Sequence, residues 1–364
     1  MRYTKLFKQN EIYDKKLLLI SLLLTCVGLI VLADASAPLA ERSFADKFFF
    51  VKQQIVWAFA GIILLFVVSK IRYTFWEKIA TPLFFITLVG LLAVFLPGLG
   101  AKFLGAHRWI IIGSISFQPS EFVKLSLALY IAKVASSKKK AAAFFVPLIL
   151  TSFLIMLQPD LGTTIVLVAM AMVQIFVSGI NMFYISISAF LGIMVAFILT
   201  VTSPYRRERL LTFFEQTRDP LGQSYHIRQI LLALGSGGLF GVGLGQSRQK
   251  YLFLPETATD SIFAVVAEEV GFLGASLLIA IYVILILRGL AIARKAPDTF
   301  SRVLSSGIIA WIGGQAFLNI ASMLAIVPLT GIPLPFLSYG GSSLTTILIA
   351  VGILLNISKY AKEK

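Results

Sequence analysis

Ten apolar runs recur along this 364-residue chain, and they constrain its fold more than any other feature. Most are close to or above the roughly 20 residues that a helix needs to cross the hydrocarbon core of a bilayer, although the fourth and fifth are shorter. In lipid, only helices and closed barrels satisfy every backbone hydrogen bond, and these runs lack the alternation of barrel strands. They therefore predict membrane-spanning helices. The expected spans are 17–36, 50–69, 79–96, 121–135, 144–158, 162–180, 182–202, 262–288, 303–327 and 342–358.

The composition excludes a soluble globular protein of this length. Hydrophobic residues make up 58% of the chain, charged residues only 13%, and the mean hydropathy is +0.90. The sequence predicts an all-α integral membrane protein, with residues 1–364 forming one polytopic domain. Cys26 is the only cysteine, which excludes a disulfide framework or a cysteine-based metal site. The first apolar run follows a basic tail and is long enough to span, so we expect no cleavable signal peptide.

The positions of Lys and Arg predict the orientation, because basic residues in short loops stay on the cytoplasmic side. With the N-terminus inside, the inner segments hold 19 of the 32 Lys and Arg residues. Both termini are therefore expected in the cytoplasm, and segments 37–49, 97–120, 203–261 and 328–341 outside. The formal net charge of +15 then indicates topology and attraction to anionic membrane lipids, not binding of nucleic acid.

The long outer segment, 203–261, is not an ordinary loop. Its stretches "YRRERLLTFF" and "YHIRQILLALGSGG" predict a basic amphipathic turn and a short apolar helix ended by glycine, both suited to lying on or dipping into the membrane. The glycine-rich run 235–245 has no Gly-Lys-Ser/Thr and no preceding strand, which excludes a phosphate loop of the NTPase type. A close-packed or re-entrant backbone is the favoured interpretation. A cradle for a lipid-linked phosphate, with Arg248 and Lys250, is the alternative.

Four carboxylates gather in the stretch "FLPETATDSIFAVVAEEV". Asp260 is expected at the outer N-terminus of the span 262–288, where the positive end of the helix stabilises an anion. Asp260 could therefore cap the helix or have a functional role. Glu256 shares a face with Asp260 only if the helix has already begun there. Glu268 and Glu269 point to different faces, so we expect that they cannot share one site and that one faces the interior.

Two further polar stretches interrupt outer junctions. In "QPDLGT", Gln158 and Asp160 flank a proline. These two residues could form a helix-capping turn or belong to a functional site. "AHRWIIIGSISFQPSEFVKLSL" carries Arg108 and Trp109, and Trp109 is by default an interfacial anchor.

The chain resembles the SEDS family of bacterial cell-wall polymerases, which includes FtsW, RodA and SpoVE. The resemblance covers nearly the whole chain and is carried by "FQPSEFVK", "QPDLGT", "PLGQSYHIRQILLALGSGGLFGVGLGQSRQKYLFLPE", "TDSIFAVVAEEVGFLG" and "PLTGIPLPFLSYGGSS", in the family's order. "GVGLGQSRQKYLFLPE" and the terminal "GILLNISKY" are more similar to the FtsW and SpoVE branch than to RodA.

The resemblance implies ten spans in the bacterial cytoplasmic membrane and an extracytoplasmic active site. The expected activity is a peptidoglycan glycosyltransferase that polymerises lipid II during cell division or cell-wall growth and releases undecaprenyl pyrophosphate. The essential aspartate of the family falls on Asp260, which would act as the general base. Basic residues of the outer segment (Arg206, Arg207, Arg228, Arg248 and Lys250) or a divalent cation, Mg or Mn, would neutralise the leaving group, without an organic cofactor. Residues expected to contact lipid II are Glu256, Arg108, Trp109, Asp160, Gln158, Tyr225, Arg228, Arg248 and Lys250.

Two other functions remain open. A lipid II flippase would use intramembrane charges such as Glu121, Lys124 and Glu269, and a scaffold for division proteins would need no outer carboxylates. Glu121 and Lys124 lie three residues apart, a spacing that favours a structural ion pair on one helix face. The expected partners of the polymerase are lipid II, a class B penicillin-binding protein, other division or elongation proteins and membrane lipids.

The chain departs from the family pattern in places, one of which is "NIASMLAIVPLTG", which lacks the usual glycines before its proline. Ala258 stands where the family usually has His, Ser261 replaces a common Phe, and His226 occupies a position that is often Gln. The change at Ala258 argues against that histidine being indispensable.

Overall fold

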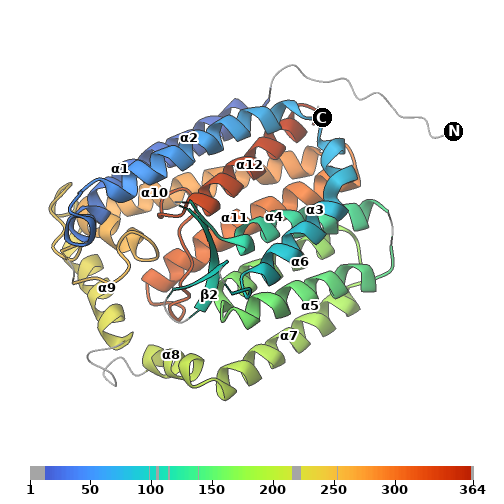
Figure 1. The fold of residues 1–364 in the computed structure, drawn as a ribbon. Helices are drawn as coiled ribbons and strands as arrows, with labels where there is room; N and C mark the ends of the chain where they lie inside the picture. The colour runs from blue at the N-terminus through green and yellow to red at the C-terminus, as the bar shows by residue number, and fades with distance from the viewer. Residues whose placement is uncertain are drawn as a thin grey trace.

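A computed structural model describes residues 13–97, 99–103, 106–113, 115–137, 139–214, 223–251 and 253–361. Each of the ten predicted spans corresponds to a helix of this part of the chain (Figure 1). The all-α membrane architecture is therefore confirmed. These helices are α1 (Lys15–Phe44), α2 (Phe49–Lys70), α3 (Tyr73–Ala93), α4 (Pro119–Ser136), α5 (Ala142–Leu157), α6 (Leu161–Val177), α7 (Met182–Thr202), α10 (Ile262–Lys295), α11 (Thr299–Met323) and α12 (Gly341–Ser358).

Within the described residues, seven of these helices are both long and apolar enough to cross a membrane: α1, α2, α3, α7, α10, α11 and α12. Helices α5 and α6 are apolar but shorter, with 16 and 17 residues. Helix α4 is buried along most of its length between α3 and α11, so it tolerates polar side chains that a lipid-facing helix would not.

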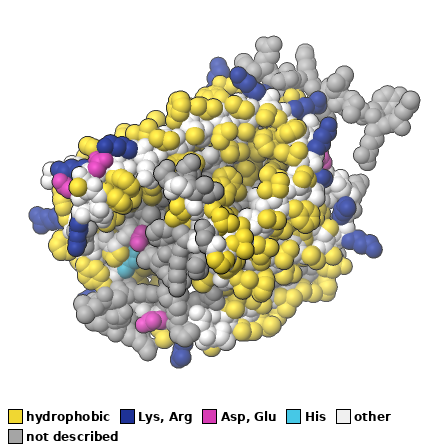
Figure 2. Space-filling view, viewed as in Figure 1, with side chains coloured by type: hydrophobic (Ala, Val, Ile, Leu, Met, Phe, Trp, Pro, Cys, Tyr) yellow, Lys and Arg dark blue, Asp and Glu magenta, His cyan; other side chains and the backbone are white. Residues whose placement is uncertain are grey.

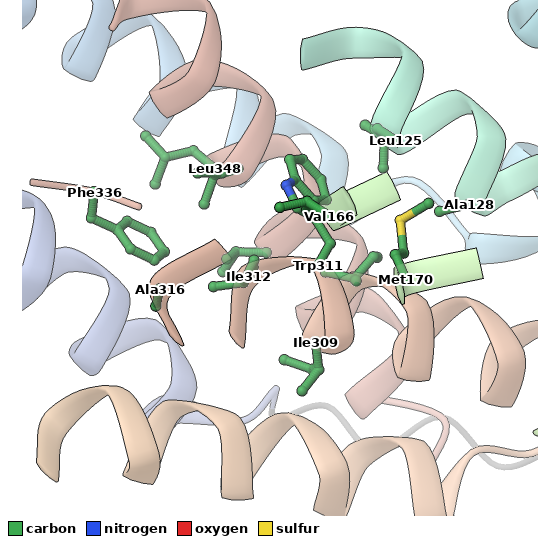
Figure 3. Packing of buried hydrophobic residues seen from close by; sticks show 14 of the residues in the cluster. Leu125, Ala128, Val166, Met170, Ile309, Trp311, Ile312, Ala316, Phe336 and Leu348 are labelled. Atoms are coloured by element: carbon green, nitrogen blue, oxygen red, sulfur yellow. The ribbon is translucent and has the colours of Figure 1, made fainter. Parts of the chain in front are cut away.

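The core lies where α4, α6, α11 and α12 meet. Leu125, Met170, Trp311 and Leu348 come together from these four helices (Figure 3). Helix α12 is almost wholly buried and packs along α2. Helix α7, by contrast, has no buried residue, so its apolar side chains face the lipid.

Charge separates to the two ends of the molecule. Figure 2 shows a broad apolar band with most Lys, Arg, Asp and Glu beyond it, as expected for a bilayer-spanning protein. The backbone N–H of Asp14 donates to the Ser358 hydroxyl at 3.0 Å, so the start of α1 and the end of α12 lie at the same end of the bundle.

The expected outer segment 97–120 contains a small antiparallel sheet that the sequence analysis did not predict. Its strands, in the order β1-β2-β3, are β1 (Gly100–Phe103), β2 (Ala106–Ile112) and β3 (Ile115–Phe117). Isoleucine favours extended backbone, and Gly113 takes the φ of +63° that the turn after β2 requires.

The long segment 203–261 contains the short helices that were predicted, α8 (Pro204–Phe214) and α9 (Gln223–Gly237). Helix α9 ends at the expected glycines, with Gly238 at φ +51°. Several boundaries were misplaced. Helix α1 continues to Phe44 and not 36, and α10 to Lys295 and not 288. Helix α3 begins at Tyr73 and not at residue 79, where the Tyr73 N–H donates to the Asn356 side chain at 2.8 Å.

Candidate functional site

Asp260 lies in a tight turn immediately before α10, as predicted. The helix begins at Ile262, and Ser261 is its N-cap. The Glu256 carbonyl accepts from the N–H groups of Thr259 and Ser261 at 3.1 and 3.0 Å, and Glu256 itself has φ +53°. The helix has therefore not begun at Glu256, so the two carboxylates do not share a helix face. The exposed Glu256 side chain accepts from the Thr259 hydroxyl at 2.7 Å and stabilises the turn.

The segment between α11 and α12 holds this turn in place by donating hydrogen bonds to the backbone carbonyls of the turn. The Tyr339 N–H donates to the Ala258 carbonyl at 2.8 Å, and the Ser338 hydroxyl donates to the Thr259 carbonyl at 2.5 Å. The buried Asn319 amide donates to the carbonyls of both Asp260 and Ile332, each at 2.8 Å. Asp260 is thereby fixed relative to a segment more than 50 residues away in the chain.

The Asp260 side chain is half-buried against Gly331. A Cβ atom at Gly331 would lie 3.4 Å from Asp260 Oδ2, and Gly331 has φ +71°, so a larger residue would be strained there. The carboxylate thus faces a backbone that approaches it closely, while part of its surface stays accessible.

Helix α9 reaches the same turn through His226. Its Nε2 lies 2.8 Å from the Ser261 hydroxyl. Two of the positions that depart from the family pattern are therefore in direct contact, so each change supplies the other's hydrogen-bond partner.

The "QPDLGT" turn lies on the other side of the same segment. A Cβ at Gly162 would come within 2.7 Å of the Thr330 carbonyl, so the start of α6 packs on the residues that flank Gly331. Asp160 caps α6, with its two carboxylate oxygens accepting from the Thr163 N–H at 3.0 Å and the Thr163 hydroxyl at 2.8 Å. The observed contacts of Asp160 are therefore those of a helix cap.

Arg108 ties the small sheet to this turn. Its Nε donates to the Gln158 carbonyl at 3.0 Å, and its Nη2 to the Pro159 carbonyl at 2.6 Å. The buried Gln158 side chain donates to the Leu91 carbonyl at 3.0 Å. The structure therefore brings Arg108, Gln158 and Asp160 together, and each makes internal contacts, although the buried Gln158 Oε1 has no hydrogen-bond donor within the described residues.

Lys250 belongs to a charge cluster next to α1 and α10. Its Nζ lies 2.6 Å from Asp34 Oδ1 and 2.8 Å from Glu269 Oε1, and the side chain is 3% exposed. Burial acts to lower the pKa of Lys250, but the hydrogen bonds to Asp34 and Glu269 outweigh it and raise the pKa above the ordinary lysine value. These contacts argue against Lys250 as a ligand of substrate.

The expectation that Glu268 and Glu269 cannot share one site is wrong. Glu268 accepts from the Ser247 hydroxyl at 2.5 Å and the Arg248 N–H at 3.1 Å, while Glu269 accepts from the Ser247 N–H at 3.2 Å. Both are buried. The turn that begins at Ser247 lies across the edge between the two helix faces, and helical periodicity alone does not anticipate that contact.

The glycine-rich run packs against a break in α10. Gly271 has φ +70°, and a Cβ there would lie 2.2 Å from the Gly241 nitrogen. The N–H groups of Val242 and Gly243 donate to the carbonyls of Glu268 and Glu269 at 3.0 and 3.1 Å. The close-packed backbone is confirmed, and these two amides are not available to cradle a phosphate.

The remaining candidates of the outer segment and the sheet are more exposed. Arg228 on α9 and Arg248 have exposed side chains, and Tyr225 and Trp109 are half-buried. Arg207 on α8 is exposed, and the side chain of Arg206 lies outside the described residues.

The predicted ion pair on α4 is confirmed. Lys124 Nζ lies 2.8 Å from Glu121 Oε1, and both side chains are buried. The same ammonium donates to Gln315 Oε1 at 2.9 Å, and the Gln315 amide donates to the Pro333 carbonyl at 2.9 Å. The pair therefore connects, through Gln315, to the segment that holds Asp260.

Sequence reasoning missed Asn319 and Gln315. Both are polar residues inside an apolar span, spaced four apart on one face of α11, and such residues usually face a polar interior. That spacing was the available signal.

The described residues contain no group of three or more His, Cys, Asp or Glu side chains that could hold a metal ion. Asp260 and Glu256 alone supply too few oxygens for a closed metal site. Mg²⁺ usually takes one or two carboxylates together with substrate phosphates, so the expected cation would fit here only as an open site.

Comparison with known proteins gives concordant matches. A family model described as "Cell cycle protein" (FtsW/RodA/SpoVE) matches residues 14–363. The chain is 43% identical to stage V sporulation protein E of Bacillus subtilis, covering 96% of this chain and 98% of that one. It is 38% identical to a probable peptidoglycan glycosyltransferase FtsW of Geobacter metallireducens, covering 98% and 97%.

Two solved structures share the fold. One is from a peptidoglycan synthase complex described as coordinating polymerization and crosslinking, with a TM-score of 0.79 and 29% identity over 95% of this chain and 97% of that one. The other is the rod shape determining protein RodA of Thermus thermophilus, with a TM-score of 0.71 and 27% identity over 97% and 98%. The higher identities to SpoVE and FtsW confirm the predicted similarity to that branch.

Proposed function

This chain belongs to the FtsW/RodA/SpoVE family, and we propose on that premise that it is a peptidoglycan glycosyltransferase that polymerises lipid II. The relatives named for this activity match it over nearly their whole length. The observation that carries the proposal is the position of Asp260. Its carboxylate is half-buried and partly accessible, and its backbone is held by Asn319.

We assign to Asp260 the role of general base. The hydroxyl oxygen of the acceptor sugar forms a bond to the anomeric carbon of the donor, and the bond from that carbon to the pyrophosphate oxygen breaks. The hydroxyl proton moves to the Asp260 carboxylate, and undecaprenyl pyrophosphate leaves. A base within about 3 Å of the hydroxyl suffices, because the pyrophosphate needs charge neutralisation and not protonation.

The exposed basic side chains of Arg228 and Arg248 are our candidates for the pyrophosphate charge. Lys250 is left out because two carboxylates already neutralise it. No step is derived through a divalent cation. A requirement for Mg or Mn stays a prediction, tested by chelation with EDTA and restoration with each ion.

The flippase alternative receives less support from the contacts of its charges. Glu121 and Lys124 pair with each other, and Glu269 binds Lys250 and the Ser247 turn. Each of these groups is buried and makes structural contacts.

The proposed location is the bacterial cytoplasmic membrane, with both ends of the chain inside and Asp260 at the outer surface. The common position of the α1 start and the α12 end supports placing both termini on one side. A class B penicillin-binding protein is the proposed partner, supported by the similarity to a solved peptidoglycan synthase complex.

The test is glycan-strand formation from purified lipid II, with and without the cognate class B penicillin-binding protein. We expect polymer from the wild type and at least about a hundredfold less from Asp260→Asn, which keeps the shape and loses the basicity. Asp46→Asn, in the exposed loop after α1, is the matched control and should polymerise normally. Normal polymerisation by Asp260→Asn at equal thermal stability would leave Asp260 only a structural role. If neither protein makes polymer with the partner present, the flippase becomes the leading hypothesis.

A further inference from the structure

A basic pocket lies at the end of the bundle remote from Asp260. It has a volume of about 370 Å³ and opens between the start of α1, the last turns of α10 and the end of α12. Asp260 precedes α10, and the pocket lies at the helix's other end; the part of α10 after the break at Gly271 alone rises roughly 35 Å. The pocket is therefore distinct from the proposed active site.

Its lining carries an excess of positive charge. Lys15, Lys16, Arg288 and Lys295 contribute four positive groups and Asp14 one negative group, which leaves a net charge of +3. Asp14 Oδ2 accepts from Arg288 Nη2 at 2.6 Å, and Asp14 Oδ1 caps α1 by accepting from the Leu17 N–H at 3.0 Å. Both oxygens of the one acid in the pocket are thus occupied.

The other charges of the pocket lack such partners. Within the described residues, the exposed side chains of Lys15, Lys16 and Lys295 make no ion pair. The Arg288 side chain is itself 37% exposed, so it still offers surface to an anion in the pocket.

A phosphate group matches this arrangement. It supplies several strong acceptor oxygens and negative charge, which Arg and Lys recognise, and the N-terminus of the 30-residue helix α1 adds its positive end. Exposed leucines continue from the pocket toward the membrane interior: Leu19 lies one turn along α1 from Lys15, and Leu287 precedes Arg288. A headgroup attached to acyl chains would contact both surfaces, which a free phosphate ion cannot do.

We propose that this pocket binds the phosphate headgroup of an anionic membrane phospholipid. Basic residues at the cytoplasmic ends of spans commonly serve topology alone. This pocket differs because three helices enclose it and because, within the described residues, only Arg288 of its four cations has an ion-pair partner. The proposal is independent of the proposed glycosyltransferase activity.

The test compares lipid retention by detergent-purified protein in native mass spectrometry. The probes are dioleoylphosphatidylglycerol, dioleoylphosphatidylcholine and inorganic phosphate. The pocket variant is Lys15→Ala/Lys16→Ala/Lys295→Ala, which leaves the Asp14–Arg288 pair intact. The matched control is Lys78→Ala/Lys139→Ala/Lys140→Ala, which removes the same charge from exposed positions of the predicted inner face outside the pocket.

The wild type and the control variant should retain phosphatidylglycerol at least about tenfold more than phosphatidylcholine, and the pocket variant should lose that preference. Melting temperatures should be equal for all three. An equal loss in the control variant, or an unchanged preference in the pocket variant, overturns the proposal. Equally tight binding of inorganic phosphate would also overturn it, since the acyl chains would then contribute nothing.

Discussion

Individual polar residues buried among apolar helices determine where Asp260 lies. Asn319 bonds at once to the turn that carries Asp260 and to the segment facing it. From the sequence, the place of Asp260 before α10 and the pairing of Glu121 with Lys124 could be predicted, because both depend on neighbours within one helix. The roles of Asn319 and Gln315 could not, since their partners come from distant segments.

The double contact of Asn319 leads to a prediction. Asn319→Asp removes the donating amide, leaves two buried carbonyls without it, and should reduce polymerisation at neutral pH by about tenfold or more. Activity relative to wild type at the same pH should recover partly at lower pH, because a protonated carboxyl can donate to one carbonyl again, whereas protonation of Asp260 lowers the activity of both proteins. Glycan-strand assays across pH measure this, with Asn181→Asp, at the exposed cap of α7, as the control. An activity loss with no pH dependence would mean that Asn319 only supports folding.

At the scale of elements, the ten long helices and the two short ones could be predicted because each depends on local apolar runs and on glycine stops. The sheet β1-β2-β3 could not be predicted, because all ten apolar runs indicated helices and the segment that contains the sheet was predicted only as a loop between two of them. The Glu268–Glu269 expectation failed for a related reason. It treated α10 as isolated, whereas the break at Gly271 allows the glycine-rich run to bond to the helix carbonyls.

The Lys250 cluster holds α1, α10 and the outer segment together, so its loss should destabilise the protein. Lys250→Met leaves the buried Glu269 and the partly buried Asp34 without a compensating charge, and we expect a loss of about 3 kcal/mol. Lys52→Met, which removes one partner of an exposed pair with Asp46, should leave the melting temperature nearly unchanged. Thermal unfolding in detergent measures both. Equal, small shifts would show that the cluster contributes little.

The raised pKa of Lys250 determines the sign of its pH dependence. A group whose pKa is higher in the folded state contributes its full stability below the unfolded pKa, and loses it as the pH rises through the folded pKa. We therefore expect no loss of stability from Lys250 between pH 6 and about 9, and a decline only in more alkaline solution. Melting curves of wild type and Lys250→Met should converge there; convergence near neutral pH would contradict the assignment.

For the whole molecule, the distribution of basic residues predicts which end of the bundle faces the cytoplasm. In a Cys26→Ala background, Asp46→Cys should react with a membrane-impermeant maleimide in intact cells, and Lys139→Cys only after lysis. Lys139 is exposed and the Asp46 side chain is 35% exposed, so access from each side of the membrane and not burial determines labelling. The opposite pattern would invert the orientation and place Asp260 inside.

The pairing of α2 with α12 has a consequence for biosynthesis. Gln54 on α2 bonds to Ser338 and Gly340, and Asn356 on α12 bonds to Ser69 and Tyr73, across more than 280 positions of the chain. The second helix to leave the ribosome therefore finds its polar partners only when the last one arrives. Until then Gln54 is a polar side chain in lipid without these partners, a cost that the nascent chain bears throughout insertion. We therefore expect these α2–α12 contacts to form only at the end of synthesis, after the other helices have been inserted.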